Sequence, residues 1–448
     1  MTRRVTSAWV LATALVVSLL GVVAPARAEL MHYTPTAGVL FNDPLTTART
    51  TIIDHLVKSI NSVPKGQKIR VASWNLRSGR ITKALMDAHH RGVSVRVIID
   101  YDNANPENPN GNFTTLHTQL PVTRYRRPAD LTSWAIRCRG ACRGTGGIAH
   151  TKMFAFSQVG RAHNVVMFGS ANATDLAAGY QWNDLYTLVE KPGLFKKAEA
   201  IFAEAALDKP VAQPLVYFPT GPFTVSWYPW QGTQAKGDPV LDELNRVRCA
   251  GATGGTGIKG FTSVRIAMTA MHGDRGLAIG QRLRTMWDRG CNVRLVYTLL
   301  GYKTRKLFEQ KTGRGPLPMQ QIVQDFDCDG VYDRYLHLKA MAVSGVYNKD
   351  THATVTWMGS SNWTALSLQS DEMGLLTTLA RVRSRYASWV DELYLNPPDS
   401  GTTDGEPCTT GTGTGTDAAV AARRLDVPES SGPSYRLAEH PFATVQVD

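Results

Sequence analysis

The sequence predicts an α/β protein built from two similar halves, each a mixed β-sheet flanked by helices. Two observations favour this class: a strand–helix–strand pattern occurs twice along the chain, and the same polar motifs follow each copy. The composition agrees, because 43% hydrophobic and 19% charged residues among 448 are typical of a globular chain with two or three domain-sized units. It excludes an intrinsically disordered protein, and the lack of heptad or Gly-X-Y periodicity excludes a coiled coil or a collagen-like fibre.

Residues 1–28 have the pattern of a secretory signal peptide. An arginine pair precedes an uncharged apolar run over 8–23, and an A-R-A sequence that ends at Ala28 suits a signal peptidase. The alternative is a membrane anchor, but this run is shorter than the roughly 18–20 residues that span a bilayer. We therefore expect cleavage near Ala28 and secretion. Cleavage removes three arginines and no acid, which lowers the formal net charge from +12 to +9 and suits anionic partners.

Cysteine usage indicates disulfides. An even number of cysteines remains after cleavage, and export to an oxidising compartment favours bridges over free thiols. A bridge between Cys138 and Cys142 is the first to expect, because both lie in one Gly- and Arg-rich loop. A zinc site is weakly supported, since only one close cysteine pair exists and no histidine follows at finger spacing. The cysteines are Cys138, Cys142, Cys249, Cys291, Cys328 and Cys408.

The first copy of the repeat begins with a predicted strand at residues 68–74. Residues 81–90 have the periodicity of a helix, and the apolar run at 91–100 predicts a buried strand. The second copy has the same order, with strands predicted at 263–268 and 289–297 around a helix at 277–288. We therefore expect a largely parallel or mixed sheet with helices on both faces.

A Pro-rich stretch near residues 210–222 separates the two copies. We accordingly assign 29–212 to an N-terminal half and 213–397 to a C-terminal half. The chain then becomes rich in Gly and Thr, which predicts a flexible linker and tail over 398–448.

Each half contains the triplet H-x-K just before an apolar run, and G-S-x-N just after the next such run. In a strand, side chains at i and i+2 point to the same face, so the His and Lys of one triplet project together. One H-x-K triplet is uninformative, whereas two copies of both motifs inside a repeat indicate a functional site. The motif residues are His150, Lys152, Ser170, Asn172, His337, Lys339, Ser360 and Asn362.

These motifs resemble the signature of the phospholipase D superfamily, H-x-K-x4-D with a downstream G-[GS]-x-N. The resemblance covers about residues 38–395, and it implies two phospholipase D-like halves that pack with one active site at their interface. One departure occurs in both halves, because the Asp position of the motif holds Ser157 and Ser344. In the family this Asp lies behind the site rather than on the phosphate.

The resemblance also implies roles. His150 is expected to be the nucleophile, and His337 the general acid and base. The cationic and amide side chains, Lys152, Lys339, Asn172 and Asn362, would hold the phosphate oxygens, with Ser170 and Ser360 in support. Two carboxylates near the following strands, Asp184 and Glu372, would each orient a histidine. No metal or other cofactor is expected.

The function expected from these residues is that of a secreted phospholipase D-type phosphodiesterase. It would hydrolyse phospholipids to phosphatidic acid and free headgroup through a phosphohistidine, or transfer the phosphatidyl group to another alcohol. One alternative is a secreted nuclease of the same superfamily, with nucleic acid as the substrate. Another is a degenerate, non-catalytic phosphate- or lipid-binding protein, which the two serines motivate. We expect a monomer that acts at a membrane surface without a stable protein partner.

Three further features have local interpretations. The run Asp325–Gly330 resembles the start of a calcium loop, but Leu336 stands where a bidentate acid is required, which favours an acidic turn. The motif Trp227–Trp230 could be core or a membrane contact, and core is favoured. Six arginines before His150 form either a solvated loop or a positive rim for phosphates: Arg124, Arg126, Arg127, Arg137, Arg139 and Arg143.

Overall fold

The computed structural model describes residues 33–122, 128–326 and 332–399. The elements of the N-terminal half are β1 (Gly38–Phe41), α1 (Thr51–Asn61), β2 (Lys68–Ser73), α2 (Gly79–His90), β3 (Ser94–Asp100), α3 (Gly111–Gln119), β4 (Trp134–Cys138), β5 (Lys152–Val159), β6 (Ala162–Gly169), α4 (Asp175–Gly179), β7 (Gln181–Trp182), β8 (Asp184–Leu188) and α5 (Pro192–Ala205). Those of the C-terminal half are β9 (Val216–Thr220), β10 (Phe223–Trp227), α6 (Pro239–Asn245), β11 (Val247–Arg248), β12 (Ser263–Met271), α7 (Gly273–Asp288), β13 (Asn292–Leu300), α8 (Tyr302–Phe308), β14 (Met319–Gln321), β15 (Val323–Gln324), β16 (Arg334–Leu336), β17 (Lys339–Tyr347), β18 (Asp350–Gly359), α9 (Ala365–Gln369), β19 (Met373–Thr377) and α10 (Ala380–Leu395).

The strand–helix–strand units predicted from the sequence are confirmed as β2–α2–β3 and β12–α7–β13. Local chemistry sets the helix starts. The Ser78 hydroxyl accepts a hydrogen bond from the amide of Ile81 at the start of α2, and the Asp238 carboxylate accepts from two amides at the start of α6. Pro239 follows Asp238 at the first helical position, where its missing amide proton costs nothing.

The two main sheets have corresponding topologies. The first has the order β1-β8-β6-β5-β2-β3-β4, and the second has β14-β13-β12-β17-β18-β19-β10-β9. When the second sheet is listed in reverse, its strands from β10 to β14 occupy the positions of β1 to β4 in the first sheet. The second sheet has β9 as an additional edge strand. In both sheets the three strands at one end are parallel and the others are antiparallel, so both are mixed, as predicted.

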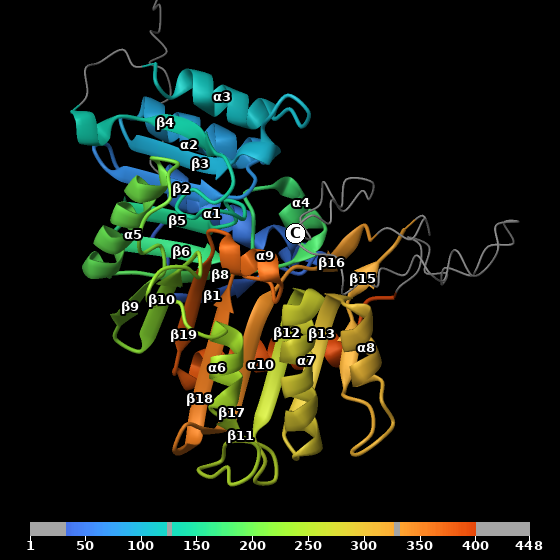
Figure 1. The fold of residues 1–448 in the computed structure, drawn as a ribbon. Helices are drawn as coiled ribbons and strands as arrows, with labels where there is room; N and C mark the ends of the chain where they lie inside the picture. Colours follow the sequence, from blue (N-terminus) through green and yellow to red (C-terminus); the bar gives the residue numbers. More distant parts are fainter. Residues whose placement is uncertain (1–32, 123–127, 327–331, 400–448) are drawn as a thin grey trace, which may run out of the picture. The chain divides into compact units, whose positions relative to one another are not determined.

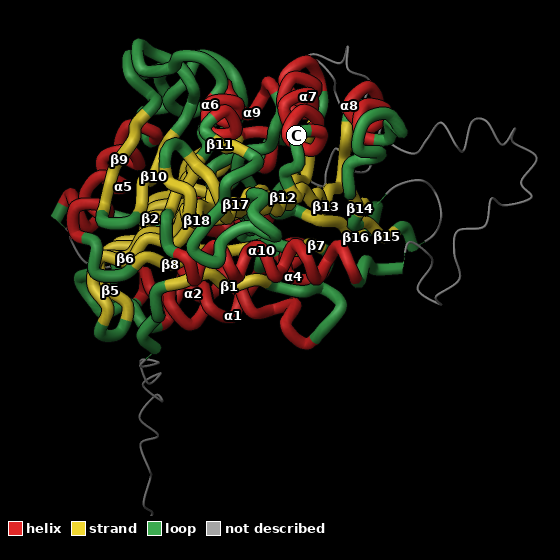
Figure 2. The backbone as a smooth tube through the Cα atoms, turned by 90° about the horizontal axis from the view of Figure 1, so that it is seen from below, coloured by secondary structure: helices red, strands yellow, loops and turns green. Residues whose placement is uncertain are grey.

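Helices cover both faces of the sheets. In Figure 2 the strands form a central layer, with α6, α7 and α8 on one side and α10 on the other. One hydrophobic core lies under α1, α2 and α3, and a second lies under α6, α7 and α8. A third core contains α5 and α10 together with side chains from both sheets, so it joins the two halves (Figure 1).

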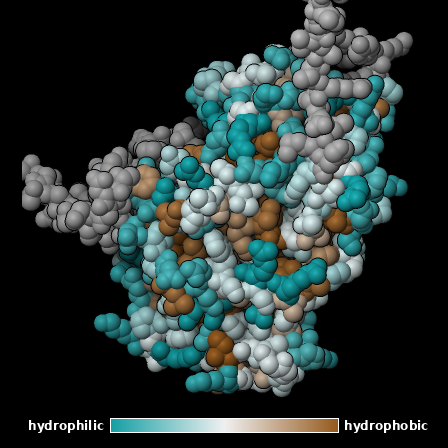
Figure 3. Space-filling view, turned by 180° about the vertical axis from the view of Figure 1, so that it is seen from behind, coloured by the Kyte–Doolittle hydropathy of each residue, from teal (hydrophilic) through white to brown (hydrophobic). Residues whose placement is uncertain are grey.

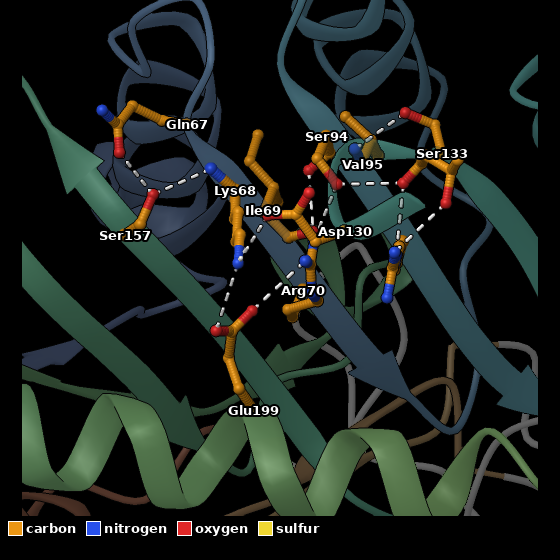
Figure 4. A network of polar contacts seen from close by, with 12 residues as sticks. Gln67, Lys68, Ile69, Arg70, Ser94, Val95, Asp130, Ser133, Ser157 and Glu199 are labelled. Atoms are coloured by element: carbon orange, nitrogen blue, oxygen red, sulfur yellow. Dashed lines mark hydrogen bonds and ion pairs between the residues drawn. The ribbon is translucent and has the colours of Figure 1, made fainter. Parts of the chain in front are cut away.

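The repeat extends to an ion pair between a buried arginine and a partly exposed carboxylate on one face of each sheet. Arg70 on β2 is 3% exposed and pairs with Glu199 on α5 at 3.2 Å, and the equivalent Arg265 on β12 pairs with Asp391 on α10. Figure 4 shows the first of these pairs, with Lys68 also close to Glu199. Because a buried guanidinium without an acceptor is costly, these pairs fix α5 and α10 against their sheets.

Two disulfides close loops in the described part of the chain. The predicted bridge between Cys138 and Cys142 is confirmed, and a second one joins Cys249 to Cys291. Cys328 and Cys408 lie outside the described residues, as do the predicted signal peptide and nearly all of the predicted tail. On the face seen in Figure 3, hydrophobic side chains form small groups near the middle, separated by hydrophilic ones.

Candidate active site

His150 lies in the loop just before β5 and is held by residues of the C-terminal half. Its backbone amide donates to the carbonyl of Asp371 at 3.0 Å. Its side chain is completely buried, and Nδ1 lies 2.9 Å from Oε1 of Glu372. A second hydrogen bond holds this carboxylate, because the Ser360 hydroxyl donates to Oε2. The two halves therefore exchange contacts at this point.

His337 has the reciprocal arrangement. Its backbone amide donates to the carbonyl of Trp182 at 2.9 Å, and its side chain is completely buried. Its Nδ1 lies 2.9 Å from Oδ1 of Asn183, and the Ser170 hydroxyl donates to the same oxygen at 2.9 Å. The Nδ2 of Asn183 donates to the carbonyl of Ala177 at 3.1 Å. Since this bond turns Oδ1 toward the imidazole, Nδ1 of His337 must be the donor.

Asn183, not Asp184, therefore orients His337. The sheet register aligns Leu185 with Gly374, which makes Asn183 the equivalent of Glu372. The sequence-based choice of Asp184 was wrong by one residue. The Asp184 carboxylate instead accepts from the amide of Ser170 at 2.8 Å and from the hydroxyl of Tyr386, and burial raises its pKa. The choice of Glu372 agrees with the contact that its carboxylate makes to His150.

The two motif lysines have matching environments. Lys152 begins β5 and its Nζ donates to the carbonyl of His150 at 2.9 Å, while Lys339 begins β17 and donates to the carbonyl of His337 at 3.1 Å. Both are buried, and both act electrostatically on Glu372. The two positive charges contributed by the two halves therefore meet around one carboxylate, which identifies a single composite site.

The motif asparagines are placed by a matching pair of bridges. Asn172 and Asn362 are 1% and 0% exposed. The residue after Asn172 pairs with Leu76 beyond the end of β2, and the residue after Asn362 pairs with the last residue of β12, Met271. Ser170 and Ser360, two residues earlier, hold the acceptors of the histidines as described above. The G-S-x-N motifs thus occupy equivalent positions in the two halves, and their serines support the acceptors of the histidines.

Burial controls the charge of the carboxyls near His150. It raises the pKa of Glu372 to about 7, although the charge of Lys152 and the hydrogen bond from Ser360 lower that pKa. It likewise raises the pKa of Asp371 to about 7, against the lowering effect of Arg143. Both carboxyls therefore change charge near neutral pH rather than near pH 4.

Asp100 is a supporting residue that the sequence analysis did not single out. It ends β3, is 1% exposed, and accepts from the amide of Ala149 at 2.9 Å, directly before His150. Its Oδ1 accepts from the amide of Asp102 at 2.9 Å. The available signal was an acid at the C-terminal end of a buried strand that belongs to the repeat. Burial raises the pKa of Asp100 to about 7.

This raised pKa predicts how Asp100→Asn changes stability with pH. The folded state holds the Asp100 proton more tightly than the unfolded state does, so the carboxyl stabilises the protein most below about pH 4. As pH rises to about 7, the unfolding free energy of the wild type should fall relative to that of Asp100→Asn by up to roughly 1.4 kcal/mol per pH unit. Urea unfolding of both proteins at several pH values measures this difference, and a constant difference would contradict the prediction.

The serines at the motif's Asp position lie away from the histidines. Ser157 is near the far end of β5, where its hydroxyl accepts from the amide of Lys68 at 2.8 Å and donates to Gln67 at 2.7 Å (Figure 4). Ser344 on β17 accepts from the amide of Gly257 at 3.2 Å. Each serine thus accepts a hydrogen bond from a backbone amide in or before the neighbouring strand of its sheet, which is β2 for Ser157 and β12 for Ser344. This role is structural.

Among the described arginines of the cluster before His150, Arg143 is not part of a positive surface rim. Arg143 is 1% exposed, with its Nε 2.9 Å from Glu204, so it is a buried link rather than a surface charge. The guanidinium carbon of Arg139 lies 4.0 Å from the ring centre of Tyr101. The other members include Arg124, Arg126 and Arg127, which lie outside the described residues.

Among the side chains that the structure describes, no group of three or more His, Cys, Asp or Glu residues could hold a metal ion. Asp327 and Asp329 of the predicted acidic turn are not among them. Trp227 is 2% exposed, which confirms the core interpretation for that residue. Within residues 33–122, 128–326 and 332–399, no helix has the length and apolar character needed to cross a membrane.

Comparison with known proteins relates part of the chain to one family model and its fold to several solved structures. Residues 56–206 match the family model described as cardiolipin synthase, PLD-like domain. Phosphatidylserine synthase from Haemophilus influenzae aligns with a TM-score of 0.51 at 12% identity, over 80% of this chain and 86% of that one. Polyphosphate kinase from Porphyromonas gingivalis gives 0.49 at 10% identity, over 81% of this chain and 50% of that one, so the chain spans about half its length. Nuc from Salmonella typhimurium, a phospholipase D family member, gives 0.28 at 18% identity, over 38% of this chain and 95% of that one. A search of curated proteins finds no match.

Fold and site together define a duplicated α/β protein with one composite site to which both halves contribute. The family model covers the H-x-K and G-S-x-N motifs of the first half, and the second half repeats the sheet topology and both motifs. Residues 56–206 therefore carry a PLD-like domain, which agrees with the family that the motifs predicted.

Proposed function

We propose that this protein is a secreted phosphodiesterase of the phospholipase D type that hydrolyses phospholipids to phosphatidic acid and a free headgroup. The observation that carries this proposal is the composite site. A buried histidine from each half is bound through Nδ1 to an acceptor of the other half, and a lysine lies two residues beyond each histidine. Members of the superfamily act on phosphodiester bonds, and this duplicated arrangement suits that chemistry.

The residues supply what phosphodiester cleavage needs. A phosphodiester carries a negative charge that repels nucleophiles, and Lys152 and Lys339 offset this charge inside a buried site. With Nδ1 bound to an acceptor, Nε2 is the nitrogen of each ring that would react. In the first step Nε2 of His150 forms a bond to phosphorus, while the P–O bond breaks and His337 protonates the leaving oxygen. In the second step His337 takes a proton from water, whose oxygen attacks phosphorus and breaks the P–N bond.

The two acceptors differ in charge, and this difference supports the assignment of roles. Glu372 is a carboxylate when ionised, and it can offset the positive charge that develops on His150 as the P–N bond forms. Asn183 is neutral and offers His337 no such compensation, so the His337 imidazolium releases its proton more readily. A nucleophile benefits from the first environment and a general acid from the second. The asymmetry therefore favours His150 as nucleophile and His337 as acid.

Two observations support lipid as the substrate and secretion as the destination. The matching family model is described by the name of a lipid enzyme, cardiolipin synthase. The disulfides Cys138–Cys142 and Cys249–Cys291 suit an oxidising compartment outside the cytoplasm.

A substrate panel tests this proposal. Purified protein should release headgroup from phosphatidylcholine or phosphatidylethanolamine vesicles, and excess plasmid or single-stranded DNA should barely inhibit it. Efficient DNA cleavage without headgroup release would instead favour the nuclease. A protein that binds vesicles but cleaves no diester, including bis(4-nitrophenyl) phosphate, would favour the non-catalytic alternative. A His150→Ala, His337→Ala double variant is the control for contaminating activity.

A further inference from the structure

The two halves differ in how much of the sheet is covered by the helix that follows β1 in the first half and β10 in the second. In the N-terminal half, α1 has 11 residues and buries Ile52, Ile53, Leu56 and Ile60 against the sheet. His55 on the same helix lies 3.1 Å from Thr187 on β8. The equivalent helix in the C-terminal half, α6, has only 7 residues, of which one, Leu244, is buried. The C-terminal sheet is therefore less covered on this face.

The space left beside α6 is a cavity of about 530 Å³. Figure 1 shows α6 in front of β17 and β18, with β9 and β10 to its left. Leu376, the register equivalent of Thr187, lines this cavity, so the cavity occupies the position that α1 fills in the other half. A volume of this size suits a ligand of several hundred daltons.

The cavity begins at the candidate active site. Its buried end includes Lys339, and Ser361 lies between two residues of the G-S-x-N motif. Lys339 and Met341 lie on the same face of β17, so the lysine and the cavity share one surface of the sheet. From there the lining reaches two exposed residues, Asp242 on α6 and Arg246 directly after it. A diester whose phosphate is bound at Lys339 could therefore extend one substituent along the cavity toward solvent.

The lining is mainly aromatic and aliphatic. Tryptophans and tyrosines supply flat apolar walls, and methionines can adapt to a flexible guest. Apart from Lys339, the charged lining residues lie on α6 or directly after it. Glu243 is already engaged, because it accepts from the hydroxyl of Tyr347 and pairs with Arg246 at 3.4 Å. The apolar lining consists chiefly of Tyr228, Trp230, Met268, Met341, Trp357 and Leu376. Such a surface can bury a hydrocarbon chain.

We propose that this cavity binds one acyl chain of the phospholipid substrate and makes the enzyme selective for long chains. The inference rests on the proposed function and adds a specificity site to it. Burial of each further methylene is favourable, so a chain that reaches deeper into the cavity raises kcat/KM several-fold per methylene. Short-chain substrates gain little from the cavity and report on the phosphate chemistry alone.

The test compares dibutyryl- and dioctanoyl-phosphatidylcholine, both kept below their micelle-forming concentrations. The wild type should prefer the longer lipid in kcat/KM by at least about 30-fold. Leu376→Trp fills the cavity and should reduce this preference to within about 3-fold, while the dibutyryl rate stays within about 2-fold of wild type. Leu395→Trp is the matched control, because Leu395 is 62% exposed and does not line the cavity. It should keep the full preference.

A second variant keeps the proposal testable if Leu376→Trp does not fold. Trp357→Ala enlarges the cavity and should move the preferred chain to a greater length. An unchanged chain-length profile in both variants would overturn the acyl site while headgroup release continued. A shift in choline-against-ethanolamine preference with no change in chain preference would overturn it in favour of a headgroup site. Failure of the wild type to cleave either lipid would instead contradict the proposed function itself.

Discussion

Replacing His150 with alanine should abolish turnover, with kcat reduced by about 10⁴-fold or more. In the proposed mechanism, Nε2 of His150 forms the covalent bond to phosphorus, and alanine has no group that can do so. His337→Ala should also be severely impaired on lipids, because an alkoxide leaves slowly without a proton donor. Steady-state rates on phosphatidylcholine measure both effects.

The two variants should differ in what they accumulate. With bis(4-nitrophenyl) phosphate the leaving group needs little protonation, so His337→Ala should still form the phosphohistidine and then hydrolyse it slowly. A burst of nitrophenol and a phosphorylated protein detectable by mass spectrometry are the expected signs. His150→Ala should give neither. A phosphorylated His150→Ala protein would contradict the assignment of the nucleophile.

His352→Ala is a suitable control for these substitutions. His352 has a side chain that is 70% exposed and lies beside Asp350 in the β17–β18 hairpin, away from the composite site. It should retain wild-type turnover. Circular dichroism and thermal unfolding should give similar curves for all three variants, which would separate loss of chemistry from loss of folding.

Glu372→Gln should lower kcat on the order of 10³-fold and change the pH profile. The substitution keeps the size of the side chain and makes the partner of His150 neutral, like the Asn183 that partners His337. The positive charge on His150 would then lack its compensating carboxylate. The rate of burst formation with an aryl diester measures this step directly.

The pH dependence gives a second readout for Glu372. Its ionised form is the active one, and burial raises its pKa to about 7, so wild-type kcat should fall as pH drops below about 7. In Glu372→Gln this group no longer titrates, so the acid limb should move to lower pH. An acid limb at an unchanged pH would assign that ionisation to another group.

Stability provides the control for Glu372→Gln. The folded-state pKa is raised from 4.5, so the ionised carboxyl costs folding free energy at pH 8. The glutamine variant should therefore be at least as stable as the wild type at pH 8, and its loss of activity cannot be attributed to unfolding. Asn183→Asp is the reciprocal variant, and it should raise the pH at which His337 loses its proton.

The sequence alone was sufficient to predict the duplication, the sheet class and the motif residues. These features are local: an apolar strand pattern, a helix of the expected period and an H-x-K triplet can be recognised within a few residues. The pairing of Cys138 with Cys142 was predictable for the same reason, because only three residues separate them. The repeat also indicated that the two copies of the motifs, although distant in the sequence, occupy equivalent positions in the two halves.

Only the tertiary structure decided which residues meet across the halves. Glu372 orients His150 although the two are 222 positions apart in the sequence, and no periodicity encodes that contact. The choice of Asp184 failed because β8 begins at Asp184 itself, one residue earlier than the apolar pattern suggested, and a shift of one residue in a strand turns a side chain to the opposite face. The cavity beside α6 was equally inaccessible, because it depends on how much of a sheet a short helix leaves uncovered. Local chemistry could be predicted from sequence neighbours, whereas register, long-range pairing and empty volume are set by the packing of the whole chain.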